Sequence, residues 1–88
     1  MEFEYDPAKS ETNALKHGIN FAEARELWND GNLVVLPSKY VAESRVLAIG
    51  RIGDNHWTAI FTERGERIRI ISVRRSRPEE KALYERNQ

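Results

Sequence analysis

Residues 56–75, HWTAIFTERGERIRIISVRR, decide the fold class, because two runs with strand-like alternation flank a short turn. In the first run, Trp57, Ala59 and Phe61 fall on one face of a strand over residues 56–62. The second run predicts a strand over residues 67–74, with Ile68 and Ile70 on its core face. Because the turn between them has only four residues, the two strands form an antiparallel hairpin.

Two further strands are predicted upstream of this hairpin. Residues 45–52 are apolar and connect to residue 56 through the turn Gly53-Asp54-Asn55. Residues 33–36 form a shorter apolar run that Pro37 ends, and residues 38–44 form a polar connection. The four strands therefore follow one another as an antiparallel meander.

The N-terminal part carries helix signals. After a short strand over residues 3–5, Asp6 as the cap and Pro7 as the first residue predict a helix that ends near His17. Gly18 supplies its left-handed end, and Asn20 begins a second helix with Glu23 three positions on.

A third helix, opened by Ser76 with Pro78 in its first turn, completes the chain. The element order is β-α-α-β-β-β-β-α. We expect one α+β domain over residues 1–88, with an antiparallel sheet and the helices packed on one side of it.

Composition excludes several classes of protein. The 88 residues are 40% hydrophobic and contain no cysteine, which excludes disulfides and cysteine-ligated zinc. No apolar run reaches the roughly 18–20 residues of a membrane span, and the first residues do not resemble a signal peptide. We therefore expect a cytoplasmic protein that does not bind membranes.

The net charge of zero conceals a strong asymmetry. Residues 1–44 hold four basic and eight acidic residues, a net charge of −4, whereas residues 45–77 hold eight Arg, no Lys and three acids, a net charge of +5. Arg presents a planar fork that binds phosphate in a bidentate manner, which favours an anionic partner. The alternative is a solvated sheet with charged rims.

Arginine is thus the main candidate for chemistry. Arg64, in the expected turn, and Arg74, at the end of the Ile68/Ile70 face, are predicted to stabilise negative charge in a transition state. Arg74 can equally be a structural ion-pair partner. The arginines expected to bind such an anionic partner are Arg51, Arg67, Arg69 and Arg75.

Three other residues are candidates for proton transfer. Imidazole titrates near neutral pH, so His17 beside Lys16 can carry protons, although a helix end also favours a cation for structural reasons. Tyr84 either packs the last helix or directs its hydroxyl across the sheet. No metal-binding spacing and no phosphate-cradling glycine loop are present, so we expect neither a metal site nor a cofactor.

Taken together, these residues resemble the BrnT family. The similarity includes FEYDP at residues 3–7, KHGINF at residues 16–21 and RIISVR at residues 69–74, followed by Glu80 and Tyr84. It covers nearly the whole chain in order.

The resemblance implies a RelE-like α+β fold and a ribonuclease toxin of a type II toxin–antitoxin system that inhibits translation. It also implies neutralisation by a BrnA-like antitoxin with a ribbon-helix-helix domain, in a heterotetramer that binds operator DNA only through the antitoxin.

Two hypotheses from different classes follow. One is a metal-independent endoribonuclease, in which the RNA 2′-hydroxyl attacks the adjacent phosphate, arginines stabilise the charge, and Lys16, His17 or Tyr84 moves protons. The other is a non-catalytic RNA-binding or adaptor domain that uses the same arginine-rich sheet.

Overall fold

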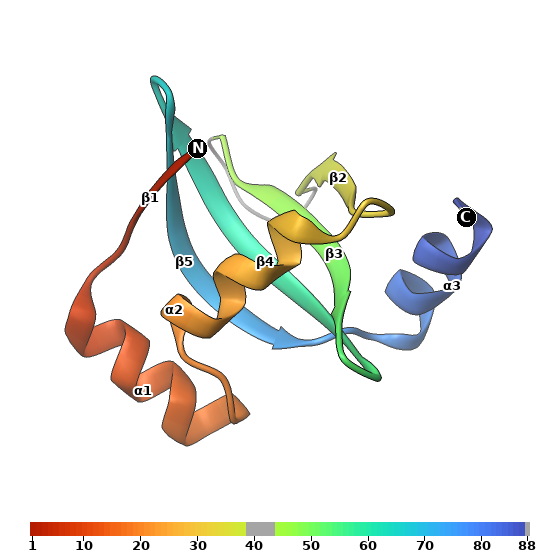
Figure 1. Ribbon diagram of the computed structural model, residues 1–88, viewed down its shortest axis with the longest axis horizontal. Coiled ribbons are helices and arrows are strands. Elements are labelled where there is room, and N and C mark those ends of the chain that lie inside the picture. Colours follow the sequence, from red (N-terminus) through yellow and green to blue (C-terminus); the bar gives the residue numbers. More distant parts are fainter. Residues whose placement is uncertain (39–43, 88) are drawn as a thin grey trace.

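A five-stranded sheet in the order β1-β5-β4-β3-β2 is the framework of the computed structural model, which describes residues 1–38 and 44–87 (Figure 1). The α+β class and the expected element order are confirmed. The expected polar connection over residues 38–44 lies mostly outside the described residues. The elements are β1 (Glu2–Glu4), α1 (Pro7–His17), α2 (Phe21–Ala24), the 3₁₀ helix η1 (Arg25–Asn29), β2 (Val34–Pro37), β3 (Val46–Ile52), β4 (Asn55–Arg64), β5 (Arg67–Arg75) and α3 (Pro78–Arg86).

The sheet is mixed, which corrects the expectation of an antiparallel sheet. Strands β2 to β5 form the predicted antiparallel meander. Strand β1, however, runs parallel to β5, with Glu2 opposite Arg67 and Glu4 opposite Arg69. Its direction depends on a partner more than sixty residues away, so local alternation carries no information about it.

One face of the sheet, here called the core face, packs against α2 and η1, while α1 lies beside β5 and contacts α2. Trp57, Ala59 and Phe61 lie on it as predicted, and they pack with Phe21 of α2 and Leu27 of η1. Both of these helical side chains are almost fully buried. The capping residues also act as predicted, since Asp6 accepts from Ala8 N–H and Gly18 adopts a φ of 80°.

Helix α3 lies against the opposite face, so the helices are not all packed on one side. Thr58 alternates with Trp57 and Ala59 along β4, and its hydroxyl donates to the Glu80 carboxylate of α3 over 3.0 Å. The core face is already covered by the N-terminal helices, which leaves only this face for α3. Figure 1 shows α3 well apart from α1 and α2. We call this second face the α3 face.

A β-bulge between Ile60 and Phe61 of β4 changes which side chains of β5 share a face. Phe61 pairs with Ile70 but Ile60 pairs with Ser72, so Ile71 is the extra residue. Alternation therefore restarts after the bulge.

The expected placement of Arg74 beside Ile68 and Ile70 is consequently wrong. Arg74 pairs with Thr58 on the α3 face, the face that also carries Arg67 and Arg69. Arg75 moves to the core face instead, where its guanidinium lies 5.4 Å from the Trp57 ring centroid.

Helix α1 is fixed to β5 by one buried side chain, Asn13. Its amide nitrogen donates to the carbonyls of Ile19 at 2.8 Å and Val73 at 2.9 Å, and its oxygen accepts from Val73 N–H at 3.1 Å. Because β1 pairs only with residues 67–69, Asn13 takes the place of a strand partner further along β5. The C-terminal turn of α1 is thereby held beside the bulge.

We expect Asn13→Ala to lower the free energy of unfolding by about 2–4 kcal/mol, because it leaves three buried backbone groups without partners. Asn87→Ala is the control, since Asn87 is exposed and its side chain bonds only to the Leu83 carbonyl of its own helix. Urea unfolding followed by circular dichroism measures both. Equal small losses in the two variants would contradict the anchoring role of Asn13.

Candidate functional site

A pocket of about 280 Å³ lies between α1 and β5, and we call it the α1–β5 pocket. Its α1 side chains recur every three or four positions, which places them on one helical face. Ile71, the extra residue of the bulge, belongs to its wall on the strand side, so the irregular part of β5 opens into the pocket. The lining residues are Lys9, Thr12, Asn13, Lys16, His17, Ile71 and Ser72.

The α1–β5 pocket is basic and has no carboxylate in its lining. By contrast, three further pockets in the described part of the chain are each lined by at least two acidic residues. Within residues 1–38 and 44–87, the side chains of Lys9, Lys16 and His17 make no ion pair and no hydrogen bond. The hydrogen-bond donors of these side chains and the positive charges of the two lysines are therefore available to an anion.

Arg74 is held in a bidentate ion pair with Glu80. The two N–H···O distances are 2.8 and 2.9 Å, and the side chains are only 21% and 10% exposed. Glu80 also accepts from the Thr58 hydroxyl and from Arg77 N–H. Burial works to raise the pKa of Glu80, but these hydrogen bonds outweigh it and lower the pKa to about 2.

The same contacts define the start of α3. Arg77, not the expected Ser76, caps the helix, and Glu80 satisfies its free N–H. Ser76 instead contacts the Thr58 hydroxyl at 2.8 Å. Arg74 thus joins β5 to α3 through an ion pair, which is the second of the two roles considered for this residue.

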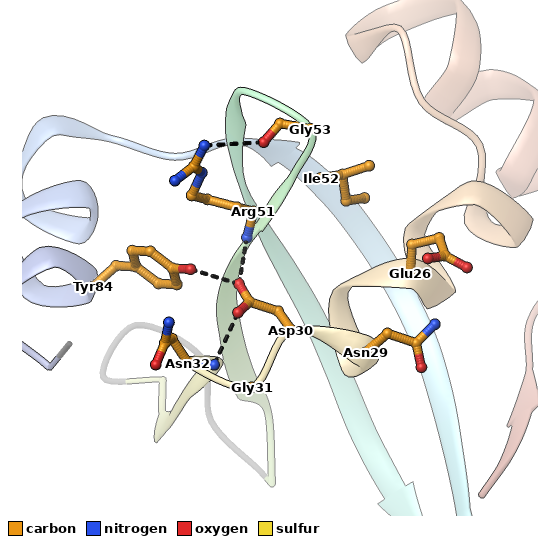
Figure 2. A pocket seen from close by; sticks show the side chains of 9 residues that line it. All are labelled: Glu26, Asn29, Asp30, Gly31, Asn32, Arg51, Ile52, Gly53 and Tyr84. Atoms are coloured by element: carbon orange, nitrogen blue, oxygen red, sulfur yellow. Dashed lines mark hydrogen bonds between the residues drawn. The ribbon is translucent and has the colours of Figure 1, made fainter.

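Tyr84 lines a second pocket, of about 450 Å³, beside the β3–β4 turn (Figure 2). Its hydroxyl donates to the Asp30 carboxylate over 2.7 Å, and that carboxylate also accepts from the N–H groups of Asn32 and Arg51. Figure 2 shows the Arg51 guanidinium turned away from Asp30 and toward Gly53, whose carbonyl it meets at 3.2 Å.

This arrangement limits the chemistry of Tyr84. Burial, the hydrogen bond to Asp30 and the Asp30 charge all raise the pKa of Tyr84. Burial also works to raise the pKa of Asp30, but the bonds from Tyr84 and the two backbone N–H groups hold it below its usual value. At neutral pH the phenol is protonated and its proton is directed at Asp30, so Tyr84 is poorly placed to accept a proton from a substrate.

Arg64 and Arg67 are partly neutralised by β1. Arg64 lies 3.8 Å from Glu4, and Arg67 lies 3.5 Å from Glu2 and 3.9 Å from Glu4. These pairs are long and largely exposed, so they hold the arginines only weakly. Arg64 is the last residue of β4 rather than part of the expected turn.

Comparison with protein families gives one match. Residues 5–80 match the family model described as a ribonuclease toxin, BrnT, of a type II toxin–antitoxin system. The chain belongs to the BrnT family. No curated protein matches the chain. In the described ranges, no helix is long and apolar enough to cross a membrane.

Membership of the BrnT family makes the chain a ribonuclease toxin, with RNA as its substrate and an antitoxin as its partner. The mixed α+β sheet agrees with the RelE-like fold that the resemblance implied. The predicted site residues, however, are distributed over several places. Lys16 and His17 share the α1–β5 pocket, Arg51 and Tyr84 share the pocket of Figure 2, and Arg64 and Arg67 meet at the β4–β5 turn.

Lys9 and Asn13 are two residues of the α1–β5 pocket that sequence reasoning missed. Lys9 lies two helical turns before Lys16 on the same face of α1, and Asn13 lies between them. The seven-residue spacing of the two lysines is a signal that was available in the sequence. No such signal indicated the role of Asn13, because its partner Val73 is sixty positions away.

The lowered pKa of Glu80 predicts a pH-dependent part of stability. The folded-state pKa of about 2 lies below the ordinary value of 4.5, so this stabilisation is complete above about pH 4.5 and is lost as pH falls toward 2. We expect about 2–3 kcal/mol from this group. The difference in unfolding free energy between the wild type and Glu80→Gln should therefore shrink over that interval, as measured by urea unfolding at several pH values.

Glu79→Gln is the matched control, because Glu79 precedes Glu80 on α3 and is exposed. Its difference from the wild type should stay small throughout. A Glu80→Gln difference that does not change between pH 5 and pH 2 would show that the ion pair does not stabilise the fold as described.

Proposed function

We propose that this BrnT-family toxin is a metal-independent endoribonuclease that cleaves RNA at the α1–β5 pocket and thereby inhibits translation. The observation that carries the proposal is the pairing of Lys16 and His17 in a pocket without carboxylates. An RNA phosphate is repelled by acidic linings, so this pocket suits it better than the acidic ones do.

The reaction needs few protein groups. The 2′-hydroxyl of RNA attacks the adjacent phosphorus and loses its proton, while the 5′-oxygen of the next nucleotide leaves and gains one. The products are a 2′,3′-cyclic phosphate and a 5′-hydroxyl. We assign the proton transfers to His17 and the stabilisation of the phosphorane charge to Lys16.

Arginines on the α3 face extend this site along β5. Arg69 lies two residues before Ile71 of the pocket, and Arg67 and Arg64 follow toward the β4–β5 turn. We propose that these three bind RNA phosphates and that Arg64 also contributes to charge stabilisation. Their weak pairing with Glu2 and Glu4 is compatible with this role, because exposed pairs exchange readily.

The other arginines have different surroundings. Arg74 holds α3 through its ion pair with Glu80. We propose that it acts on RNA only at long range, through the part of its positive charge that Glu80 does not neutralise. Arg75, stacked on Trp57 at the core face, and Arg51, at the pocket of Figure 2, are proposed as outlying RNA contacts.

We propose metal independence because of the charges in the pocket. Lys16 places a cationic group where a metal ion would otherwise supply the charge. Within the described ranges, no group of three or more acidic or histidine side chains is arranged so that it could hold a metal ion.

For the antitoxin we propose a BrnA-like protein with a ribbon-helix-helix domain. A cytoplasmic nuclease with exposed arginines has to be held inactive, and an acidic or apolar segment laid over them does this sterically. Dimerisation of the antitoxin leads to a heterotetramer that reaches operator DNA through the antitoxin alone.

We expect His17→Ala to reduce RNA cleavage by about 10²–10⁴-fold, because it removes the proton carrier of the pocket. His56→Gln is the matched control, because His56 lies away from the α1–β5 pocket and bonds to Glu85. Tyr84→Phe should keep most of the activity. Cleavage is followed with labelled RNA, and the product ends are identified by their sensitivity to phosphatase.

The same assay tests metal dependence, and we expect cleavage to survive excess chelator.

Expressed alone in a bacterium, the wild type should arrest growth and His17→Ala should not. RNA binding without cleavage would favour the alternative, a non-catalytic RNA-binding or adaptor domain. Cleavage lost in Tyr84→Phe but kept in His17→Ala would place the reaction at the pocket of Figure 2.

Covering of the site by the antitoxin predicts that partner and RNA compete. Arg69→Glu should weaken the binding of both by about tenfold or more, because reversed charge repels phosphates and acidic side chains alike. Arg25→Glu, exposed on η1 and outside the lining of the α1–β5 pocket, should change neither. Binding is measured with RNA and with the protein encoded next to the toxin gene, and an antitoxin affinity unchanged in Arg69→Glu would contradict the covering of this face.

A further inference from the structure

Charge is segregated around helix α1. Lys9, Lys16 and His17 line the α1–β5 pocket, whereas Glu11, the only acid in the sequence of this helix, points about 200° away from Lys9 at roughly 100° per residue. The pocket side of α1 is therefore uniformly basic. A solvated helix has no reason to separate its charges in this way, whereas a helix that faces a polyanion does.

Lys9 is distinguished by its distance from the proposed chemistry. It lies seven residues before Lys16, which corresponds to about 10 Å along the helix axis. This separation is too long for Lys9, Lys16 and His17 all to hold one phosphate closely. It suits two phosphates of one strand, each met by a different part of the helix.

Three of the arginines on the sheet are less free. Arg74 is bound to Glu80, and Arg64 and Arg67 face Glu2 and Glu4, while the described residues place no carboxylate within 4 Å of the Lys9 ammonium. Asn13, between Lys9 and Lys16, fixes the helix to Val73 through three hydrogen bonds. Lys9 thus has no ion-pair partner among the described residues, and it lies on a helix whose position is fixed.

We propose that Lys9 binds a backbone phosphate of single-stranded RNA that neighbours the phosphate being cleaved. The α1–β5 pocket then holds two phosphates, the reacting one at Lys16 and His17 and the neighbouring one at Lys9. The inference rests on the proposed function for the place of the reacting phosphate. Its consequence is that Lys9 determines RNA affinity and has little effect on the chemical step.

The test uses a short single-stranded oligonucleotide with 2′-deoxy sugars, which has the phosphates of RNA but cannot be cleaved by 2′-hydroxyl attack. Its affinity is measured by fluorescence anisotropy over a range of salt concentrations. The slope of log affinity against log salt changes by about 0.7 for each phosphate contact on a single strand. Lys9→Gln should reduce the slope by about this amount and weaken binding at low salt, and Lys9→Arg should restore both.

Lys81→Gln is the matched control, because Lys81 is an exposed lysine on a helix outside the pocket. It should leave slope and affinity unchanged. With cleavable RNA, Lys9→Gln should raise KM while kcat stays within about twofold of the wild type. A wild-type slope in Lys9→Gln, or equal reductions in Lys9→Gln and Lys81→Gln, would overturn the inference.

Failure of the inference and failure of the proposed function are distinguishable. If the protein cleaves RNA but Lys9→Gln keeps the wild-type slope, the function stands and the Lys9 contact does not. If the slope falls in Lys9→Gln but the wild type cleaves no RNA, the phosphate contact stands and the nuclease proposal falls. Antitoxin binding weakened in Lys9→Gln with oligonucleotide binding intact would assign Lys9 to the protein partner and overturn the inference.

Discussion

The contact between Asn13 and Val73 determines where the proposed chemistry can occur. A strand at the edge of a sheet needs a partner for its backbone groups, and β1 pairs with β5 only over residues 67–69. Further along, the Asn13 amide supplies both a donor and an acceptor to Val73, as a neighbouring strand would. The same amide binds the Ile19 carbonyl and so fixes the chain that leaves α1. Without this contact the basic side of α1 would have no defined distance from β5, and the pocket would lose one wall.

The arginines of residues 45–77 have two different roles in the structure. Arg74 forms a nearly buried bidentate pair with Glu80, which itself caps α3 through Arg77 N–H. Arg64 and Arg67 remain exposed and only loosely opposed by β1. A count of charges does not distinguish these residues. Their surroundings make Arg74 part of the fold, whereas Arg64 and Arg67 are free to bind an anion.

Most of the local structure could be predicted from the sequence, because its causes are local. Asp6 with Pro7, Gly18, and Asn20 with Glu23 act within a few residues of themselves, and each does what its pattern indicates. Apart from the cap of α3 and the end of β4, the errors concern contacts across long separations. The direction of β1 depends on β5, and the face occupied by α3 depends on which face the N-terminal helices already cover. The places of Lys16 and His17 within one pocket, and the inclusion of Lys9, likewise required α1 to be placed against β5.

The β-bulge at Ile71 connects these errors to the proposed function. Strict alternation along residues 67–75 puts Arg74 with Ile68 and Ile70, and a single extra residue reverses this assignment for everything that follows. The reversal sends Arg74 to Glu80 and α3, and it brings Ile71 and Ser72 to the α1–β5 pocket. A regular strand here would place a different set of side chains opposite Lys16 and His17 and would leave α3 without its ion pair. The bulge that makes the sequence pattern misleading therefore also forms one wall of the pocket. Departures from local rules are expected where a fold builds a functional site.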